Sequence, residues 1–291
     1  MHPNLPMYPN LFLIGAPKCG TSALHDYLAQ HPDVFMSEPK EPHHFCTDLN
    51  APFAIRDREA YEALFRDADT PVIGESSATY LYSKVAAQNI FEVYPDARII
   101  AMLRNPLEML PSLHSQKRVN GTEPCAGFAE ALEAEKRRKT GELEVHGAFP
   151  YYYDAARYSE QLTRYLERFP AAQVHVIVFD DFKRDAGAVY AGVLKFLGLP
   201  PFTLDFKLVN RNKRIRSRTL HTFLQNPRSP VNRLPKPFST LTYKTLDKLN
   251  SAVETRVALE PALREQLRHD FTPEVESLSD LLGRDLRGWL E

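Results

Sequence analysis

The sequence predicts an α/β fold, a three-layer sandwich in which helices cover both faces of a central parallel sheet. Short apolar runs of strand length alternate along the chain with longer segments of helical periodicity, as crossover connections between parallel strands require. Of the 291 residues, 43% are hydrophobic and 25% are charged, which is ordinary globular usage and enough for a large apolar core. No internal repeat or low-complexity tract interrupts the pattern, so residues 1–291 are expected to form a single domain.

Strands are expected where the apolar runs are short and end at a turn. The first run, 10–15, has the composition of a buried strand, and Val34–Met36 is a shorter strand-like run. Further strands are expected at 72–74, 98–103 and 173–179.

Helices are expected between the strands, where apolar residues recur at intervals of three or four. The first runs from Thr21 to His31 and places its apolar side chains on one face. After Leu199 the strands are expected to stop, and a helical tail covers about 243–282. The other helices are expected at 59–65, 84–94, 106–117, 126–139, 155–169 and 185–197.

Charge and cysteine content exclude several classes of protein. The chain has 36 Lys and Arg against 37 Asp and Glu, a net charge of −1, which gives no reason to expect nucleic acid or an anionic membrane as partner. No apolar stretch approaches the length of a membrane span, and Leu11–Ile14 is too short for a signal peptide. Cys19, Cys46 and Cys125 lack CxxC spacing, so neither a disulfide scaffold nor a zinc site is indicated, and the reducing cytoplasm is the expected location.

The segment 203–240 is strongly basic. Its nine basic residues face a single acidic one, Asp205, which gives this segment a net charge of +8. Four prolines argue against a continuous helix and favour a lid-like loop over the scaffold. Few aromatic residues, such as Phe206 and Phe223, accompany the basic residues, which disfavours nucleic-acid binding. The basic residues are Lys207, Arg211, Lys213, Arg214, Arg216, Arg218, Arg228, Arg233 and Lys236.

The stretch 11–24 predicts an anion site, because a strand, a glycine-containing turn and a helix that begins with hydroxyl residues follow one another. The amides of such a turn and of the helix N-terminus bind phosphate-like groups. In nucleotide triphosphatases a lysine follows the second glycine, but here Thr21 follows Gly20 and the lysine is Lys18, inside the loop. Lys18 is therefore expected at the bridging oxygen of a transferred group. There are two alternatives to this interpretation. One is a simple turn in which Thr21 or Ser22 caps the helix, and the other is an ordinary ATP or GTP loop.

The stretch 98–112 predicts a second anion site, again a strand that runs into a helix. Arg104 closes the strand, and Ser112 follows two helical turns later. Ligands of open parallel sheets bind at the carboxyl ends of the strands, so Arg104 is expected to face the same crevice as Lys18. Alternatively, this arginine binds the last carbonyls of a neighbouring element.

These two stretches resemble a known family. Residues 17–24, P-K-C-G-T-S-A-L, resemble the 5′-phosphosulfate loop of sulfotransferases that use 3′-phosphoadenosine 5′-phosphosulfate (PAPS), and Arg104 to Ser112 resembles their 3′-phosphate motif. The chain is similar to the Golgi carbohydrate branch, especially heparan sulfate sulfotransferases, and to bacterial relatives without a membrane anchor. Further resemblances lie in 31–34, in 74–81, which matches a G-E-x-S-P-x-Y-L stretch, and in the C-terminal 282–289.

The resemblance implies how a PAPS donor binds. Lys18 contacts the oxygen between sulfate and phosphate, and Arg104 and Ser112 hold the 3′-phosphate. The best match to the K-G-R cofactor loop of the family is at Lys213 and Arg214. Three roles are open for the basic segment: it caps the 3′-phosphate, holds an anionic acceptor or forms a solvated surface. The residues implied around the 5′-phosphate are Pro17, Cys19, Gly20, Thr21, Ser22 and Ala23.

The resemblance also implies a catalytic base. In Ser37–Phe45, Glu41 and His43 fall where 3-O-sulfotransferases have E-V-H-F-F, whose glutamate is the proposed base. Glu41 is therefore the favoured base and His43 the alternative or its partner; a solvated surface is the other interpretation of these charges. The glycan enzymes have lysine at the position of Ser76 and proline at that of Ala78, so a heparan-like acceptor is not implied.

No metal is expected at this site. Adjacent histidines point apart, so His43 and His44 with Cys46 do not make a convincing ligand set. Magnesium is unnecessary because sulfate carries less charge than a γ-phosphate and Lys18 can neutralise the leaving group. The aromatic run Tyr151–Tyr153 lines an acceptor pocket or packs in the core.

The expected function is transfer of the sulfuryl group from PAPS to a hydroxyl or amine of a carbohydrate or other small-molecule acceptor, with adenosine 3′,5′-bisphosphate as product. One alternative is a P-loop nucleotide-dependent kinase of related fold, which would need magnesium ligands, for which Asp180 and Asp181 are the only candidates. The other is a non-catalytic nucleotide-binding module.

Overall fold

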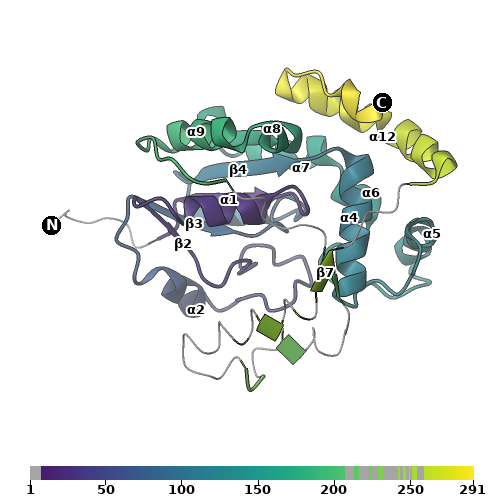
Figure 1. The fold of residues 1–291 in the computed structure, drawn as a ribbon, viewed down its shortest axis with the longest axis horizontal. Helices are drawn as coiled ribbons and strands as arrows, with labels where there is room; N and C mark the ends of the chain where they lie inside the picture. The colour runs from purple at the N-terminus through teal and green to yellow at the C-terminus, as the bar shows by residue number, and fades with distance from the viewer. Residues whose placement is uncertain are drawn as a thin grey trace.

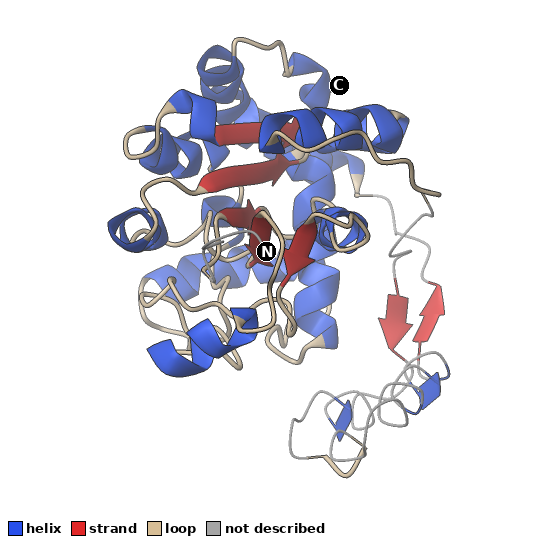
Figure 2. Ribbon diagram, turned by 90° about the vertical axis from the view of Figure 1, so that its left-hand side faces the viewer, coloured by secondary structure: helices blue, strands red, loops and turns tan. Residues whose placement is uncertain are grey.

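The computed structural model describes residues 8–206 and 259–291 and, between them, residues 213–215, 223–224, 229–231, 242, 245–246, 249 and 251–253. A five-stranded parallel sheet forms the centre, with the strand order β2-β3-β1-β4-β5. Helices cover both faces of this sheet (Figure 1, Figure 2). The α/β sandwich that the sequence predicts is confirmed.

The central strand is buried along its whole length, as its uninterrupted apolar sequence requires. All the expected runs form strands, and the third extends two residues beyond the predicted 72–74. Because the strands are parallel, the carboxyl ends of three neighbours, β3, β1 and β4, meet at one edge. The strands are β1 (Leu11–Gly15), β2 (Val34–Met36), β3 (Val72–Ser76), β4 (Arg98–Leu103) and β5 (Val174–Val178).

Helices form in the predicted segments up to residue 197, although several boundaries differ. The predicted tail 243–282 is interrupted by a short strand at 251–253, and its C-terminal helix begins at Pro261. The first helix ends at Leu28 rather than His31. The predicted 155–169 corresponds to a shorter helix, Tyr158–Leu166, and a separate short helix, Tyr152–Ala155, precedes it. The predicted 59–65 ends in a 3₁₀ turn, Ala63–Phe65. The α-helices are α1 (Thr21–Leu28), α2 (Arg58–Glu62), α3 (Ala86–Val93), α4 (Pro106–Val119), α5 (Phe128–Lys139), α6 (Tyr152–Ala155), α7 (Tyr158–Leu166), α8 (Phe179–Arg184), α9 (Ala186–Leu197) and α12 (Pro261–Leu282).

The prediction that strands stop after Leu199 is wrong. Two short strands, β6 (Lys213–Ile215) and β7 (Ser251–Val253), pair antiparallel in a separate two-stranded sheet (Figure 2). Strands of three residues so far apart in the sequence leave no local periodicity from which to predict them. Most of the basic segment 203–240 lies outside the described residues, so its expected role as a lid stays a prediction.

The C-terminal residues bind back onto the body of the fold. The indole N–H of Trp289 donates to the Asp180 carboxylate at 2.8 Å. The backbone carbonyl of Trp289 accepts from the side-chain amide of Asn105 at 2.8 Å, just before α4 begins. Helix α12 packs against α7 and α4. Of the helices in the described residues, none combines the length and apolar character that crossing a membrane requires.

Candidate active site

The turn after β1, residues 16–20, is called the Lys18 loop. Gly20 lies just before α1 with φ 94°, a conformation that favours glycine. A Cβ at Gly20 would lie 3.0 Å from the Phe179 ring and 3.2 Å from Met102, so a side chain there would require these neighbours to shift. The first amides of a helix have no carbonyl partner within the helix, and Thr21 and Ser22 at the start of α1 line a cavity. The anion-binding turn predicted from the sequence thus has the expected strand–turn–helix geometry.

Lys18 links this loop to two other segments. Its ammonium donates to the Gln116 side chain on α4 at 3.2 Å, and its carbonyl accepts from the Arg104 guanidinium at 3.1 Å. The contact with Gln116 was not expected from the sequence, because the two residues lie 98 positions apart.

Arg104 follows the last residue of β4, as predicted, and its side chain is buried. Its Nε donates to Glu108 at 3.1 Å, and the guanidinium lies 4.7 Å from the centre of the Phe179 ring. Ser112 is buried on α4 and lines the same cavity. The structure therefore brings Arg104, Ser112 and Lys18 together at one cavity. Arg104 also donates to the carbonyl of Lys18, so it both lines the cavity and binds a backbone carbonyl, the two arrangements considered from the sequence.

One cavity of about 1110 Å³ receives most of the predicted site residues. Cys19 does not line it: this side chain is fully buried, its Sγ contacts the Pro17 carbonyl at 3.3 Å, and burial raises the pKa of the thiol to about 12. Lys213 and Arg214 form part of β6, and their side chains lie outside the described part of the chain. The predicted residues that line the cavity are Pro17, Lys18, Gly20, Thr21, Ser22, Ala23, Glu41, His43, Arg104 and Ser112.

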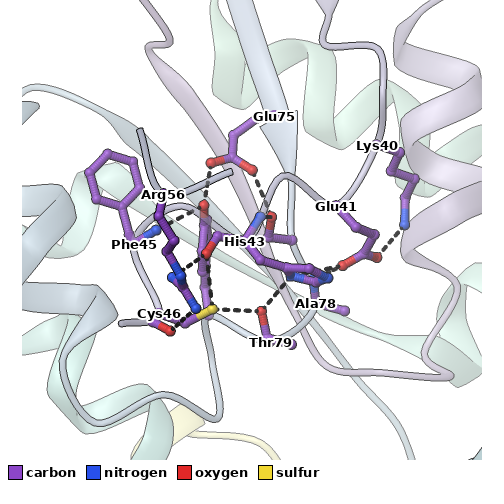
Figure 3. A network of polar contacts seen from close by, with 11 residues as sticks. Lys40, Glu41, His43, Phe45, Cys46, Arg56, Glu75, Ala78 and Thr79 are labelled. Atoms are coloured by element: carbon purple, nitrogen blue, oxygen red, sulfur yellow. Dashed lines mark hydrogen bonds and ion pairs between the residues drawn. The ribbon is translucent and has the colours of Figure 1, made fainter. Parts of the chain in front are cut away.

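The segment 37–46, called the Glu41 loop, runs beside the end of β3. The Glu41 amide donates to the Ser76 carbonyl at 2.9 Å, and its carboxylate accepts from the Ala78 amide at 2.9 Å and from Lys40 at 2.6 Å (Figure 3). The His43 ring lies 3.6 Å from the Glu41 carboxylate. The two residues considered as base are therefore neighbours that face the cavity together.

Thr79 contacts the same ring nitrogen of His43 that lies nearest to Glu41. The His43 Nδ1 and the Thr79 hydroxyl are 2.8 Å apart, and Thr79 also lines the cavity. Burial lowers the pKa of His43, and the charges of Lys40 and Arg56 lower it further, while the charge of Glu41 opposes them. A neutral imidazole at neutral pH is the consequence.

Backbone strain concentrates at the predicted catalytic residues. Among the described residues, the non-glycine residues with positive φ are Lys18, Glu41, His43 and Phe53, at 63°, 63°, 53° and 60°. Such conformations cost of order 1–3 kcal/mol each and persist where the surrounding structure holds them. Three of the four are the residues to which the sequence assigns catalysis.

Arg56 is a structural residue that sequence reasoning missed. Its guanidinium donates to four backbone carbonyls at 2.7–3.1 Å, and these fix the chain that follows Glu41. No local motif could have identified it, because its partners are backbone oxygens. The four carbonyls belong to His43, His44, Cys46 and Leu49.

The metal interpretation of this loop receives no support from the geometry. The His44 ring stacks on Tyr61 with 4.2 Å between ring centres and contacts the Ile55 carbonyl at 2.7 Å. The Cys46 thiol contacts the His43 carbonyl and the Thr79 hydroxyl, each at 3.3 Å. His44 and Cys46 are thus engaged in packing and backbone contacts.

Two other sets of candidates also have structural roles. Tyr152 is buried and donates to Glu123 at 2.9 Å, and Tyr153 donates to Asp270 at 2.7 Å, so the run 151–153 packs rather than lining the cavity. Asp180 and Asp181, the magnesium ligands that a kinase would need, make other contacts. Asp180 accepts a hydrogen bond from Trp289, and Asp181 forms ion pairs with Arg284 and Arg184.

Comparison with known proteins agrees with this geometry. The model of the Sulfotransferase family matches residues 9–203. The human bifunctional heparan sulfate N-deacetylase/N-sulfotransferase 2 is 29% identical over 204 residues, which cover 67% of this chain and 22% of that protein. Mouse carbohydrate sulfotransferase 15 is 25% identical over 311 residues, covering 88% of this chain and 54% of that protein. The chain therefore spans only part of the length of these relatives.

A solved structure extends the likeness to nearly the whole chain. The crystal structure of a sulfotransferase from Alicyclobacillus acidocaldarius has a TM-score of 0.72 and 31% sequence identity, and the match covers 98% of this chain and 99% of that one. The family match over 9–203 includes the Lys18 loop, the Glu41 loop and the segment from Arg104 to Ser112. Together the matched sequence and the shared fold show that this protein belongs to the sulfotransferase family.

Proposed function

We propose that the protein transfers the sulfuryl group of PAPS to a hydroxyl or amine of a carbohydrate or other small-molecule acceptor. The observation that carries the proposal is that one cavity is lined by the Lys18 loop, by Arg104 and Ser112, and by Glu41 and His43. Its volume of about 1110 Å³ lies just above the range of roughly 300–1,000 Å³ for ligand sites, which fits a nucleotide and a second molecule.

The donor side of the cavity fits a molecule with two separate anionic groups. The amides at the start of α1 and the hydroxyls of Thr21 and Ser22 suit the 5′-phosphosulfate, and Lys18 supplies the cation for the bridging oxygen. Arg104 and Ser112 would hold the 3′-phosphate, and a phosphate there competes with Glu108 for the guanidinium. Since Lys18 can neutralise the leaving phosphate, the proposal requires no metal.

The acceptor side offers a base and a hydrogen-bonding partner. Glu41 would take the proton of the acceptor hydroxyl, and His43, held by Thr79, would orient it or act as base itself. The protein's contribution to such a reaction is mainly positioning and electrostatic stabilisation of charge on the leaving oxygen. Ser76, at the position of a lysine in the glycan enzymes, is fully buried and does not line the cavity, so the proposal names no heparan-like acceptor.

Several wider assignments belong to the same proposal. Residues 1–291 are assigned to one sulfotransferase domain, and Lys213 and Arg214 of the basic segment 203–240 are assigned to the 3′-phosphate of the donor. The three cysteines are free thiols, which fits the proposed location in the reducing cytoplasm.

The test is turnover of PAPS labelled with radioactive sulfur over a panel of neutral sugars, glycosaminoglycan fragments, phenols and aliphatic alcohols, with and without EDTA. We expect labelled product that depends on the acceptor and is indifferent to EDTA. Tight binding of adenosine 3′,5′-bisphosphate without transfer to any acceptor would favour a non-catalytic module instead. Transfer from ATP that EDTA abolishes would favour the kinase.

A further inference from the structure

Glu75 is a carboxylate buried completely at the end of β3, next to the Glu41 loop. It accepts three hydroxyl hydrogen bonds: Oε1 from Tyr80 at 2.6 Å and from Tyr61 at 3.0 Å, and Oε2 from Ser77 at 2.9 Å. The stretch 74–81 that contains it resembles other family members, but neither donor binding nor the proposed base uses Glu75. A fully buried carboxylate with three donors needs a reason beyond packing, because burial of such a group is costly unless it is fully hydrogen-bonded.

Two of these hydroxyls make a second hydrogen bond, to the backbone of the Glu41 loop. The Ser77 hydroxyl accepts from the His43 amide at 3.0 Å, and the Tyr80 hydroxyl accepts from the Phe45 amide at 3.4 Å. A hydroxyl has one proton and two lone pairs. When Ser77 and Tyr80 donate that proton to Glu75, their lone pairs are available to the two amides, so the carboxylate sets the direction of both hydroxyls.

We propose that Glu75 is a positioning residue for sulfuryl transfer, which holds the backbone of the Glu41 loop through the hydroxyls of Ser77 and Tyr80. The inference rests on the proposed function for its catalytic consequence. Glu41 and His43 have the positive φ angles noted above, so their backbone needs support from outside the loop. Arg56 binds the carbonyls of this segment, while the Glu75 network binds its amides, and the two sets of contacts together fix the loop.

Tyr61 provides a matched control within the same network. Tyr61 and Tyr80 are both buried tyrosines that donate to the same oxygen of Glu75, but among the described residues Tyr61 donates to no loop carbonyl and accepts from no loop amide. Tyr61→Phe and Tyr80→Phe each delete one hydroxyl and keep the ring, including the stacking of Tyr61 on His44. Each substitution therefore removes one hydrogen bond to Glu75, but only Tyr80→Phe also removes the hydrogen bond from the Phe45 amide.

The experiment compares Tyr80→Phe, Ser77→Ala and Glu75→Gln with Tyr61→Phe and the wild-type protein. The first measurement is hydrogen exchange at the His43 and Phe45 amides by NMR, which needs no catalytic activity. We expect faster exchange at Phe45 in Tyr80→Phe and at His43 in Ser77→Ala. In Glu75→Gln we expect faster exchange at one of these two amides, because the amide oxygen still accepts a hydroxyl proton on its side while the NH₂ on the other side cannot. Tyr61→Phe should leave both amides protected as in the wild-type protein.

The second measurement is kcat and KM with PAPS and the best acceptor of the panel. We expect kcat to fall about 10- to 100-fold in Ser77→Ala and Glu75→Gln, as small displacements of catalytic groups do, with KM for PAPS within about twofold of wild type. Tyr80→Phe should show a smaller loss in the same direction, and Tyr61→Phe should keep kcat.

Equal losses of kcat in Tyr61→Phe and Tyr80→Phe, or unchanged exchange in Ser77→Ala and Glu75→Gln, would overturn the inference. If Glu75→Gln does not fold, Ser77→Ala and Tyr80→Phe still decide it. If the wild-type protein transfers no sulfuryl group, the proposed function fails, while the exchange measurement still shows whether Glu75 holds the loop.

Discussion

Arg104 donates a hydrogen bond of 3.1 Å to the carbonyl of Lys18, and this bond joins the end of β4 to the loop that follows β1. The two strands are neighbours in the sheet, so the segments that the sequence assigns to the two phosphates of the donor are held at a fixed separation. Preorganisation of this kind favours a ligand with two anionic groups over one with a single group.

Arg104→Ala should weaken binding of adenosine 3′,5′-bisphosphate much more than binding of AMP, because the two nucleotides differ in the 3′-phosphate. A hydrogen bond to a charged group contributes roughly 1.5–3 kcal/mol, so calorimetry should show a loss of about 10- to 150-fold for the bisphosphate. Glu108→Gln should strengthen binding of the bisphosphate, because it removes the carboxylate that competes with the 3′-phosphate for the Arg104 guanidinium. Equal losses for both nucleotides in Arg104→Ala would contradict the assignment.

Lys18→Ala should lower kcat by about 10²-fold or more with little change in KM. The reason is that charge grows on the bridging oxygen only as the S–O bond breaks, so the lysine stabilises the transition state more than the bound donor. Steady-state kinetics with PAPS measures both constants. A variant with near-normal kcat and a raised KM would show instead that Lys18 only binds the donor.

Glu41→Gln should abolish most turnover of an alcohol acceptor while bisphosphate binding persists, because glutamine keeps the shape of the side chain and loses the proton acceptor. The expected loss of kcat is about 10²–10⁴-fold, the typical contribution of a general base. An acidic phenol, already ionised, should escape part of this loss. His43→Ala should cost less on both acceptors; full activity of Glu41→Gln on the alcohol, with His43→Ala inactive, would assign the base to the histidine.

The stability of the wild-type protein should fall relative to Glu75→Gln as the pH rises from 4 to 8. Burial raises the pKa of Glu75 from 4.5 to about 7, the charge of Glu41 raises it further, and the hydroxyls of Tyr80, Ser77 and Tyr61 oppose the shift. The folded state therefore holds this proton more tightly than the unfolded state, and folding loses that contribution between about pH 4.5 and 7. Urea unfolding at several pH values should show a relative change of up to about 3 kcal/mol. Parallel pH profiles for the two proteins would contradict the raised pKa.

Local sequence was sufficient to predict the central sheet and two of the segments that line the cavity. Each strand of the sheet is a short apolar run that ends at a turn, and the Lys18 loop is a contiguous motif whose geometry follows from its glycines and its hydroxyl residues. Arg104 was predictable because the carboxyl ends of neighbouring parallel strands meet. Glu41 and His43 were found only through a resemblance, since nothing in the spacing of 37–46 indicates a base.

The contacts that complete the site could not be read from the sequence. Lys18 and Gln116 meet across 98 positions, and Arg56 binds backbone oxygens, which have no sequence signature. The pairing of β6 with β7 also joins distant segments, each only three residues long. Such contacts depend on the packing of whole elements, and local periodicity carries no information about them.

Arg56 donates to four backbone carbonyls, so these hydrogen bonds to the segment after Glu41 do not depend on the side chains of that segment. A substitution at the exposed Thr47 can therefore leave all four carbonyl contacts in place, whereas Asp48, also exposed, accepts hydrogen bonds from Ser83 and from the Lys84 amide. The course of the backbone after Glu41 and the identity of its exposed side chains are separable in such an arrangement.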